Sequence, residues 1–113
     1  GFSQGACLML EYAARHAERF GGIAALAGAL IGDEHDQRFD AGDFAGTPIL
    51  LACGDADDHI PEPRVRLSAV TLAAQGAVID LRIYPGITHT IVSDQLDALR
   101  AMVEVVRAHA MAE

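Results

Sequence analysis

The first five residues, Gly1-Phe2-Ser3-Gln4-Gly5, form the stretch that decides the fold. They match the pattern G-x-S-x-G, in which a serine occupies a tight turn between a strand and a helix. Backbone segments cross closely at such a turn, so we expect side chains at Gly1 and Gly5 to be sterically excluded. The same pattern also occurs in ordinary loops, so its interpretation as a nucleophile turn depends on partner residues further along the chain.

The composition limits the classes of protein that this chain can represent. With 113 residues it is at most one domain, and its 51% share of hydrophobic residues is typical of a chain with a buried core. The formal net charge of −8 disfavours nucleic acid and anionic membrane surfaces as partners. Charged residues interrupt every apolar run before it reaches the roughly 18 residues of a membrane span. The chain does not start with a basic segment followed by an apolar one, so no signal peptide is predicted.

The cysteines and histidines predict neither a disulfide framework nor a metal site. Cys7 and Cys53 are too few for such a framework and are expected to be small buried residues of a protein in the reducing cytoplasm. The histidines show no paired ligand spacing, so no metal or other cofactor is predicted. They are His16, His35, His59, His89 and His109.

Apolar periodicity predicts that helices and strands alternate along the chain. We expect helices over residues 4–20 and 63–75 and from residue 93 onwards, and strands over 23–27, 48–53 and 78–84. Strand 78–84 alternates in polarity and is placed at the sheet edge. The stretch of residues 28–46 is polar and rich in acidic residues. It predicts a solvated loop with a short helical turn, and the loop is long enough to overhang a site. Together these elements indicate a three-layer α/β fold with a parallel sheet of about three strands flanked by helices.

Two helices carry further expectations. Glu11 and Arg15 are placed on the polar side of the first helix. Ser93 is the expected N-cap of the last helix. The apolar stripe of that last helix is expected to consist of Leu96, Leu99, Val103 and Val106.

Ser3, Asp57 and His89 are the candidate catalytic residues. A serine hydroxyl needs a base, usually a histidine, and the histidine needs an acid that fixes its tautomer. His89 directly follows strand 78–84 and Asp57 follows strand 48–53, so both lie at the carboxyl end of the sheet, where chemistry collects in such folds. The order Ser, Asp, His is that of the α/β-hydrolases. Asp55 and Asp58 remain alternative acids.

Three segments resemble the phospholipase/carboxylesterase family of α/β-hydrolases, which includes acyl-protein thioesterase-like enzymes. They are Gly1-Phe2-Ser3-Gln4-Gly5-Ala6, Gly54-Asp55-Ala56-Asp57 with Ile60-Pro61, and Tyr84-Pro85-Gly86 with His89. The resemblance implies that Ser3 is the nucleophile, that Asp57 is the acid and that His89 is the base. The backbone N–H of Gln4 is the expected oxyanion donor. The family usually has an apolar residue where this chain has His59, which is therefore expected to be a loop-surface histidine.

The resemblance also implies a function and a partner. It covers the C-terminal half of a single α/β-hydrolase domain, so residues 1–113 are expected to lack the N-terminal half. The predicted activity is hydrolysis of carboxylic esters or thioesters through an acyl-enzyme. A non-catalytic fragment or assembly module that retains these residues is the alternative, as is a dienelactone-hydrolase-like enzyme, although that family usually has Cys at Ser3. The open edge of strand 23–27 predicts pairing with a copy of the chain or with a separate N-terminal half.

Overall fold

The chain forms a parallel sheet between two layers of helices. The structure, a computed structural model, describes residues 1–32, 38 and 40–112, and the side chains up to residue 109. Its elements are α1 (Gln4–Arg15), β1 (Ile23–Leu26), β2 (Pro48–Gly54), α2 (Glu62–Ala74), β3 (Val78–Tyr84) and α3 (Ser93–Ala112). The sheet has the order β1-β2-β3, and all of its strands are parallel. This is the three-layer α/β architecture, with a parallel sheet flanked by helices, that the sequence predicts.

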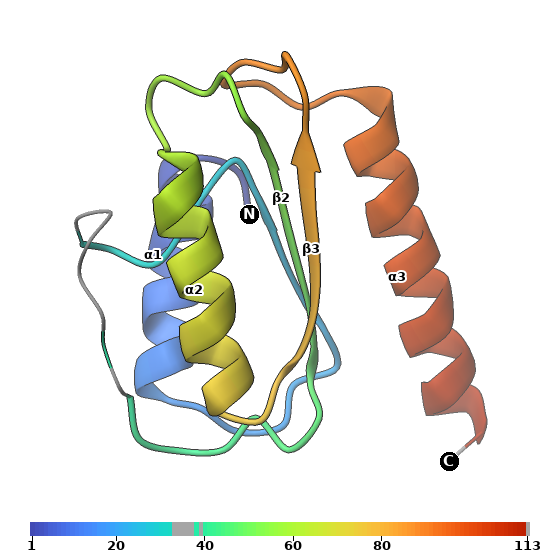
Figure 1. Ribbon diagram of the computed structural model, residues 1–113. Helices are drawn as coiled ribbons and strands as arrows, with labels where there is room; N and C mark the ends of the chain where they lie inside the picture. The colour runs from blue at the N-terminus through green and yellow to red at the C-terminus, as the bar shows by residue number, and fades with distance from the viewer. Residues whose placement is uncertain (33–37, 39, 113) are drawn as a thin grey trace.

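The helices cover both faces of the sheet. In Figure 1, α1 and α2 lie on one face and α3 lies on the other. The larger core cluster fills the space between the sheet and α1 and α2, and it includes Leu10, Leu51 and Leu72. A smaller cluster around Leu50 and Ala98 joins the opposite face to α3.

The burial of each strand follows from its place in the sheet. All residues of β2 after Pro48 are buried, because both neighbouring strands and both helical layers cover it. The apolar sequence of β2 suits that central position. Exposed and half-buried residues alternate along most of β3, which confirms its predicted position at the edge.

The first helix is shorter than the apolar periodicity predicts. It ends at Arg15, and His16 leaves the helical conformation with φ −127° and ψ 43°. Beyond this point, Phe20 packs against the ring of Phe44 at 6.3 Å, and its N–H donates a hydrogen bond to Thr47 Oγ1 (2.9 Å). These contacts hold the segment after α1 against the chain before β2, so tertiary packing overrides the helical pattern.

The segment between β1 and β2 is more deeply packed than a solvated loop. Leu30 and Phe44 are buried within it, and the Leu30 N–H donates to Ser68 Oγ of α2 (2.9 Å). Of the predicted acidic stretch, residues 33–37 and 39 lie outside the described part of the chain, and this includes His35. The described remainder contains no helical turn.

Helix α3 is rotated relative to the predicted stripe. Leu99 packs against the smaller core cluster as predicted, and Val106 is half-buried. Leu96 and Val103 are exposed, while Ala98 is buried and Met102 packs against the sheet. The helix includes Ser93 as its first residue, so Ser93 is not the cap. The side chain that ties down the helix start is Gln95, whose Oε1 accepts the Val92 N–H (3.1 Å).

Candidate active site

Ser3 lies in the tight turn that joins a β-bridge to α1. Phe2 pairs in parallel with Leu26 of β1, and the Ser3 N–H donates to the Leu26 carbonyl (3.0 Å). Ser3 itself has φ 54° and ψ −124°, a sparsely populated conformation for a residue with a side chain. The strained backbone projects the hydroxyl away from the turn, as in a nucleophile turn.

The glycines of the turn differ in their surroundings. A Cβ at Gly1 would lie 2.9 Å from the Ala6 backbone nitrogen, which confirms steric exclusion at this position. A Cβ at Gly5 would meet no atom of the described residues within 4 Å, so the steric expectation for Gly5 is wrong here. The close approach occurs instead at Gly28, where a Cβ would lie 2.4 Å from the Ala6 side chain.

Asp57 is held in the loop after β2 by hydrogen bonds to the backbone. Its carboxylate is fully buried, and Oδ1 accepts the N–H groups of His59 and Ile60, both at 2.8 Å. Burial alone would raise the pKa of Asp57, but the hydrogen bonds from His89, Ile60 and His59 outweigh it and lower the pKa below its ordinary value. The side chain is therefore an oriented anion at neutral pH.

His89 joins the other two candidates into one chain of hydrogen bonds. Its Nε2 lies 2.7 Å from Ser3 Oγ, and its Nδ1 lies 2.8 Å from Asp57 Oδ2. Since an ionised carboxylate only accepts hydrogen bonds, Nδ1 carries a proton, and in the neutral imidazole Nε2 is then the acceptor for the serine hydroxyl. This is the tautomer that a general base for Ser3 requires.

The loops that carry Asp57 and His89 touch directly. A Cβ at Gly54 would lie 1.9 Å from the Ile87 carbonyl oxygen, so only glycine fits there. The Ala56 N–H donates to the same Ile87 carbonyl (3.0 Å). These contacts fix the distance between the two loops and hence between the carboxylate and the imidazole.

The alternative acids have other partners. Asp55 Oδ1 accepts the Gly86 N–H (2.7 Å), which ties the two loops together at their outer side. Asp58 is 83% exposed and lies 3.5 Å from His59 Nε2. Among these three aspartates it is therefore Asp57 whose carboxylate lies against His89.

Two aromatic rings lie against the imidazole of His89. Phe2 stacks on it at 5.4 Å between ring centroids, and His59 lies on it at 4.5 Å with a tilt of 49°. His59 is exposed, as expected for a loop-surface histidine, but the sequence does not reveal that its ring contacts His89. Its position two residues after Asp57 was the available signal.

Cys53 is a further neighbour that the sequence indicates only as a buried residue. Its Sγ lies 3.6 Å from Asp57 Oδ2, and burial together with the Asp57 carboxylate raises the pKa of the thiol to about 12. The thiol therefore stays protonated and can donate a weak hydrogen bond to the carboxylate oxygen that faces His89. Cys53 is buried as predicted, whereas Cys7 is only partly buried.

The remaining candidates are the backbone of Gln4 and two further histidines. Gln4 is the first residue of α1, and N–H groups in the first turn of a helix have no partner within the helix. His16 stacks on Tyr12 and His109 lies 3.3 Å from Arg19. Within the described residues there is no group of His, Cys, Asp or Glu side chains suited to a metal ion, and no helix is long and apolar enough to cross a membrane.

The fold and the arrangement of these residues define a partial α/β-hydrolase. The model of the family described as Phospholipase/Carboxylesterase matches residues 1–107. The chain therefore belongs to the phospholipase/carboxylesterase family, which is a family of esterase-type hydrolases.

Individual relatives agree with this membership. A phospholipase/carboxylesterase from Dyadobacter fermentans is 40% identical with a TM-score of 0.84, over 91% of this chain and 50% of its own. The esterase PE8 is 30% identical with a TM-score of 0.75, over 94% of this chain and 48% of its own. Acyl-protein thioesterase 1 of Gibberella zeae is 30% identical over 89% of this chain and 44% of its own. The chain thus spans about half the length of these relatives.

Proposed function

We propose that the chain carries the catalytic residues of a serine hydrolase that cleaves carboxylic esters or thioesters. The observation that carries the proposal is the continuous hydrogen-bonded chain from Ser3 Oγ through His89 to Asp57. The relatives named phospholipase/carboxylesterase and acyl-protein thioesterase support an acyl ester or thioester as the substrate class.

The proposed reaction begins with attack of Ser3 Oγ on the acyl carbonyl carbon. The proton of Ser3 moves to His89 Nε2, and the Asp57 carboxylate stabilises the resulting imidazolium through Nδ1–H. The Gln4 N–H donates to the negatively charged oxygen of the tetrahedral intermediate. His89 then returns the proton to the departing alcohol or thiol. Water, deprotonated by His89, releases the acid from Ser3 in a second round of the same steps.

Residues 1–113 constitute, in this proposal, the C-terminal half of an α/β-hydrolase domain. The outer edge of β1 binds only Phe2 and its neighbours within the described residues, through the Leu26 pair and the bond from the Gly1 nitrogen to the Ala24 carbonyl (2.8 Å). An N-terminal half would extend the sheet there and complete the substrate pocket. The proposed location is the reducing cytoplasm, where the thiols of Cys7 and Cys53 would stay free.

A fluorophosphonate probe tests the proposed nucleophile. We expect the folded chain to be labelled and the Ser3→Ala variant to be unlabelled. Ser93→Ala is the matched control, because Ser93 is exposed at the start of α3. This variant should be labelled to the same extent as the wild type. Absence of labelling in the folded wild type would instead favour a non-catalytic assembly role.

The proposed partner half has its own test. Co-expression with the N-terminal half of the Dyadobacter fermentans relative should raise the labelling rate, because the added half would complete the site. A rate that stays unchanged, although the two polypeptides purify together, would contradict the proposed role of that half.

A further inference from the structure

The outer edge of β3 is an open row of backbone hydrogen-bonding groups. The Val78 N–H donates to the Thr47 carbonyl, and the Tyr84 carbonyl accepts the Asp55 N–H, so both residues direct their backbone toward β2. Backbone direction alternates along a strand. The residues between them that face outward are therefore Ile79, Leu81 and Ile83. No other strand of the described residues pairs with this edge, and Figure 1 shows β3 at the outer side of the sheet.

The side chains of β3 divide between the faces of the sheet. Ile79, Leu81 and Ile83 pack against the core cluster under α1 and α2. Asp80 and Arg82 lie on the face of α3 and are exposed, and Arg82 Nε contacts Asp80 Oδ1 at 3.1 Å. The edge thus combines one face of apolar residues with one face that bears a single acid and a single base.

This charge pattern selects one register for antiparallel pairing of two identical strands. Outward-facing residues must pair with outward-facing residues, which permits central registers about Asp80, Leu81 or Arg82. The register about Asp80 sets Asp80 opposite its own copy, and the register about Arg82 does the same for Arg82. Like charges directly opposite each other are destabilising.

Only the register about Leu81 sets Asp80 opposite Arg82 of a second copy, and it does so twice by symmetry. Because Leu81 is the central residue of Val78–Tyr84, this register also pairs the strand over its full length. On the other face it brings Ile79 against Ile83 of the second copy. Charge complementarity, apolar contact and backbone pairing therefore favour the same register.

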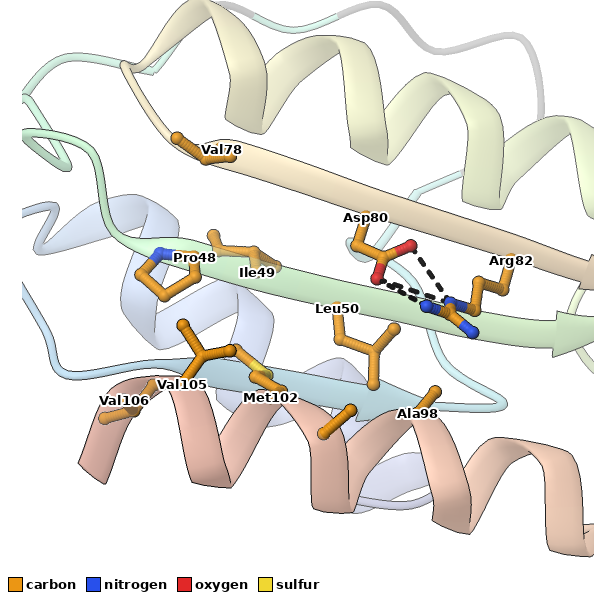
Figure 2. Close-up of a pocket in the computed structure, with 11 residues that line it drawn as sticks. Pro48, Ile49, Leu50, Val78, Asp80, Arg82, Ala98, Met102, Val105 and Val106 are labelled. Atoms are coloured by element: carbon orange, nitrogen blue, oxygen red, sulfur yellow. Dashed lines mark hydrogen bonds and ion pairs between the residues drawn. The ribbon is translucent and has the colours of Figure 1, made fainter. Parts of the chain in front are cut away.

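The sheet face beside β3 is also uncovered. Figure 2 shows α3 along the sheet face, while Val78, Asp80 and Arg82 lie on β3 and are not covered by the helix. The groove between them has a volume of about 310 Å³ and is otherwise apolar on the helix side, where Ala98, Ala101, Met102, Val105 and Val106 line it. Val105 is 67% exposed at this groove. These apolar atoms lie on the sheet face directly beside the edge at which a second strand would pair.

We propose that two copies of this chain form a homodimer through β3, antiparallel about Leu81, so that Asp80 of each copy faces Arg82 of the other. The two sheets join into one continuous sheet, and the two α3 helices lie on the same face of it. The β1 edge and the Ser3 turn lie on the far side of β2, and the pairing uses none of Ser3, Asp57 and His89, so the dimer does not depend on the proposed hydrolase function.

Charge exchange between the two positions tests this dimer. By sedimentation velocity, we expect the wild type to dimerise with increasing concentration. Asp80→Arg and Arg82→Asp alone each replace two opposite-charge pairs by two like-charge pairs, so each should dimerise at least about tenfold more weakly. An equimolar mixture of the two variants should recover the wild-type affinity, because every facing pair is again of opposite sign.

A control and a second readout separate this interface from others. Arg100→Asp reverses a charge that is 76% exposed on α3 and should leave dimerisation unchanged. Amide hydrogen exchange at Ile79, Leu81 and Ile83 should slow in the wild type as its concentration rises, and not in Asp80→Arg. A wild type that remains monomeric at several hundred micromolar would overturn the proposal. Single variants that dimerise like the wild type, or a mixture that fails to recover, would overturn it as well.

Discussion

Replacement of Glu11 by glutamine should destabilise the fold in a way that depends on pH. Glu11 lies on α1 and was expected on the polar side of that helix, but it is only 8% exposed. Its Oε2 accepts from Arg15 Nε (2.9 Å) and Arg38 Nη2 (3.1 Å), and its Oε1 accepts the Ile31 N–H (3.1 Å). The carboxylate thereby ties α1, which carries the Ser3 turn, to the segment after β1.

The magnitude follows from the pKa of Glu11. Burial alone would raise this pKa, but the hydrogen bonds from Arg38, Arg15 and Ile31 outweigh it and lower the pKa from its ordinary value of 4.5 to about 2. At about 1.4 kcal/mol per pKa unit, this lowering corresponds to at most about 3 kcal/mol of stability at neutral pH. Because the folded-state pKa is depressed, this stability is present above pH 4.5 and is lost as the pH falls toward 2.

Urea unfolding at several pH values measures this contribution. At pH 7 we expect Glu11→Gln to lower the free energy of unfolding by about 2–3 kcal/mol, since glutamine keeps an acceptor for Ile31 but loses the charge. The difference from the wild type should shrink steadily below pH 4.5. Glu62→Gln is the matched control, because Glu62 pairs with Arg66 near the surface and should cost less than about 1 kcal/mol. A Glu11→Gln deficit that is the same at pH 3 and pH 7 would refute the reasoning.

Three further predictions concern the candidate active site. Gly54→Ala should abolish fluorophosphonate labelling and lower the melting temperature, since its Cβ would lie 1.9 Å from the Ile87 carbonyl; labelling at the wild-type rate would contradict this. Asp57→Asn should slow labelling by about 10³–10⁴-fold without unfolding the chain, because the imidazole loses its oriented anion; circular dichroism checks the fold, and a loss below tenfold would argue against the assigned role. Iodoacetamide at pH 8 should alkylate Cys7 and spare Cys53, whose buried thiol has a pKa of about 12; mass spectrometry of the two peptides decides, and preferential alkylation of Cys53 would count against its burial.

Much of the fold is visible in the sequence because its signals are local. The buried run of β2 and the glycines that follow α1 and α2 mark an alternation of strands and helices, and the structure has the predicted order. The positions of Asp57 and His89 directly after β2 and β3 also follow from this order, since parallel strands bring their carboxyl ends together.

The features that the sequence does not reveal depend on contacts between distant segments. The end of α1 at Arg15 reflects the packing of Phe20 against Phe44, and the burial of Glu11 reflects a partner at Arg38. Phe44 and Arg38 lie too far along the chain for apolar periodicity to reveal either contact. The same holds for the face that α3 turns toward the sheet, where Ala98 is buried although the more hydrophobic Leu96 and Val103 are exposed.

The neighbours of the proposed catalytic residues show the same limit. Apart from its position two residues after Asp57, nothing local distinguishes His59 from a surface histidine. Cys53 likewise looks like an ordinary buried residue, yet both residues contact the hydrogen-bonded chain of Ser3, His89 and Asp57. Their roles come from the way in which the loops after β2 and β3 fold over each other at Gly54.

Trapping of the acyl-enzyme tests the central claim most directly. The folded chain is mixed with p-nitrophenyl acetate, quenched in acid and analysed by peptide mass spectrometry. We predict one acetyl group on the peptide that contains Ser3, and none in the Ser3→Ala or His89→Ala variants. An acetyl group that persists in Ser3→Ala, or its complete absence from the folded wild type, would contradict the assignment of Ser3 as the nucleophile.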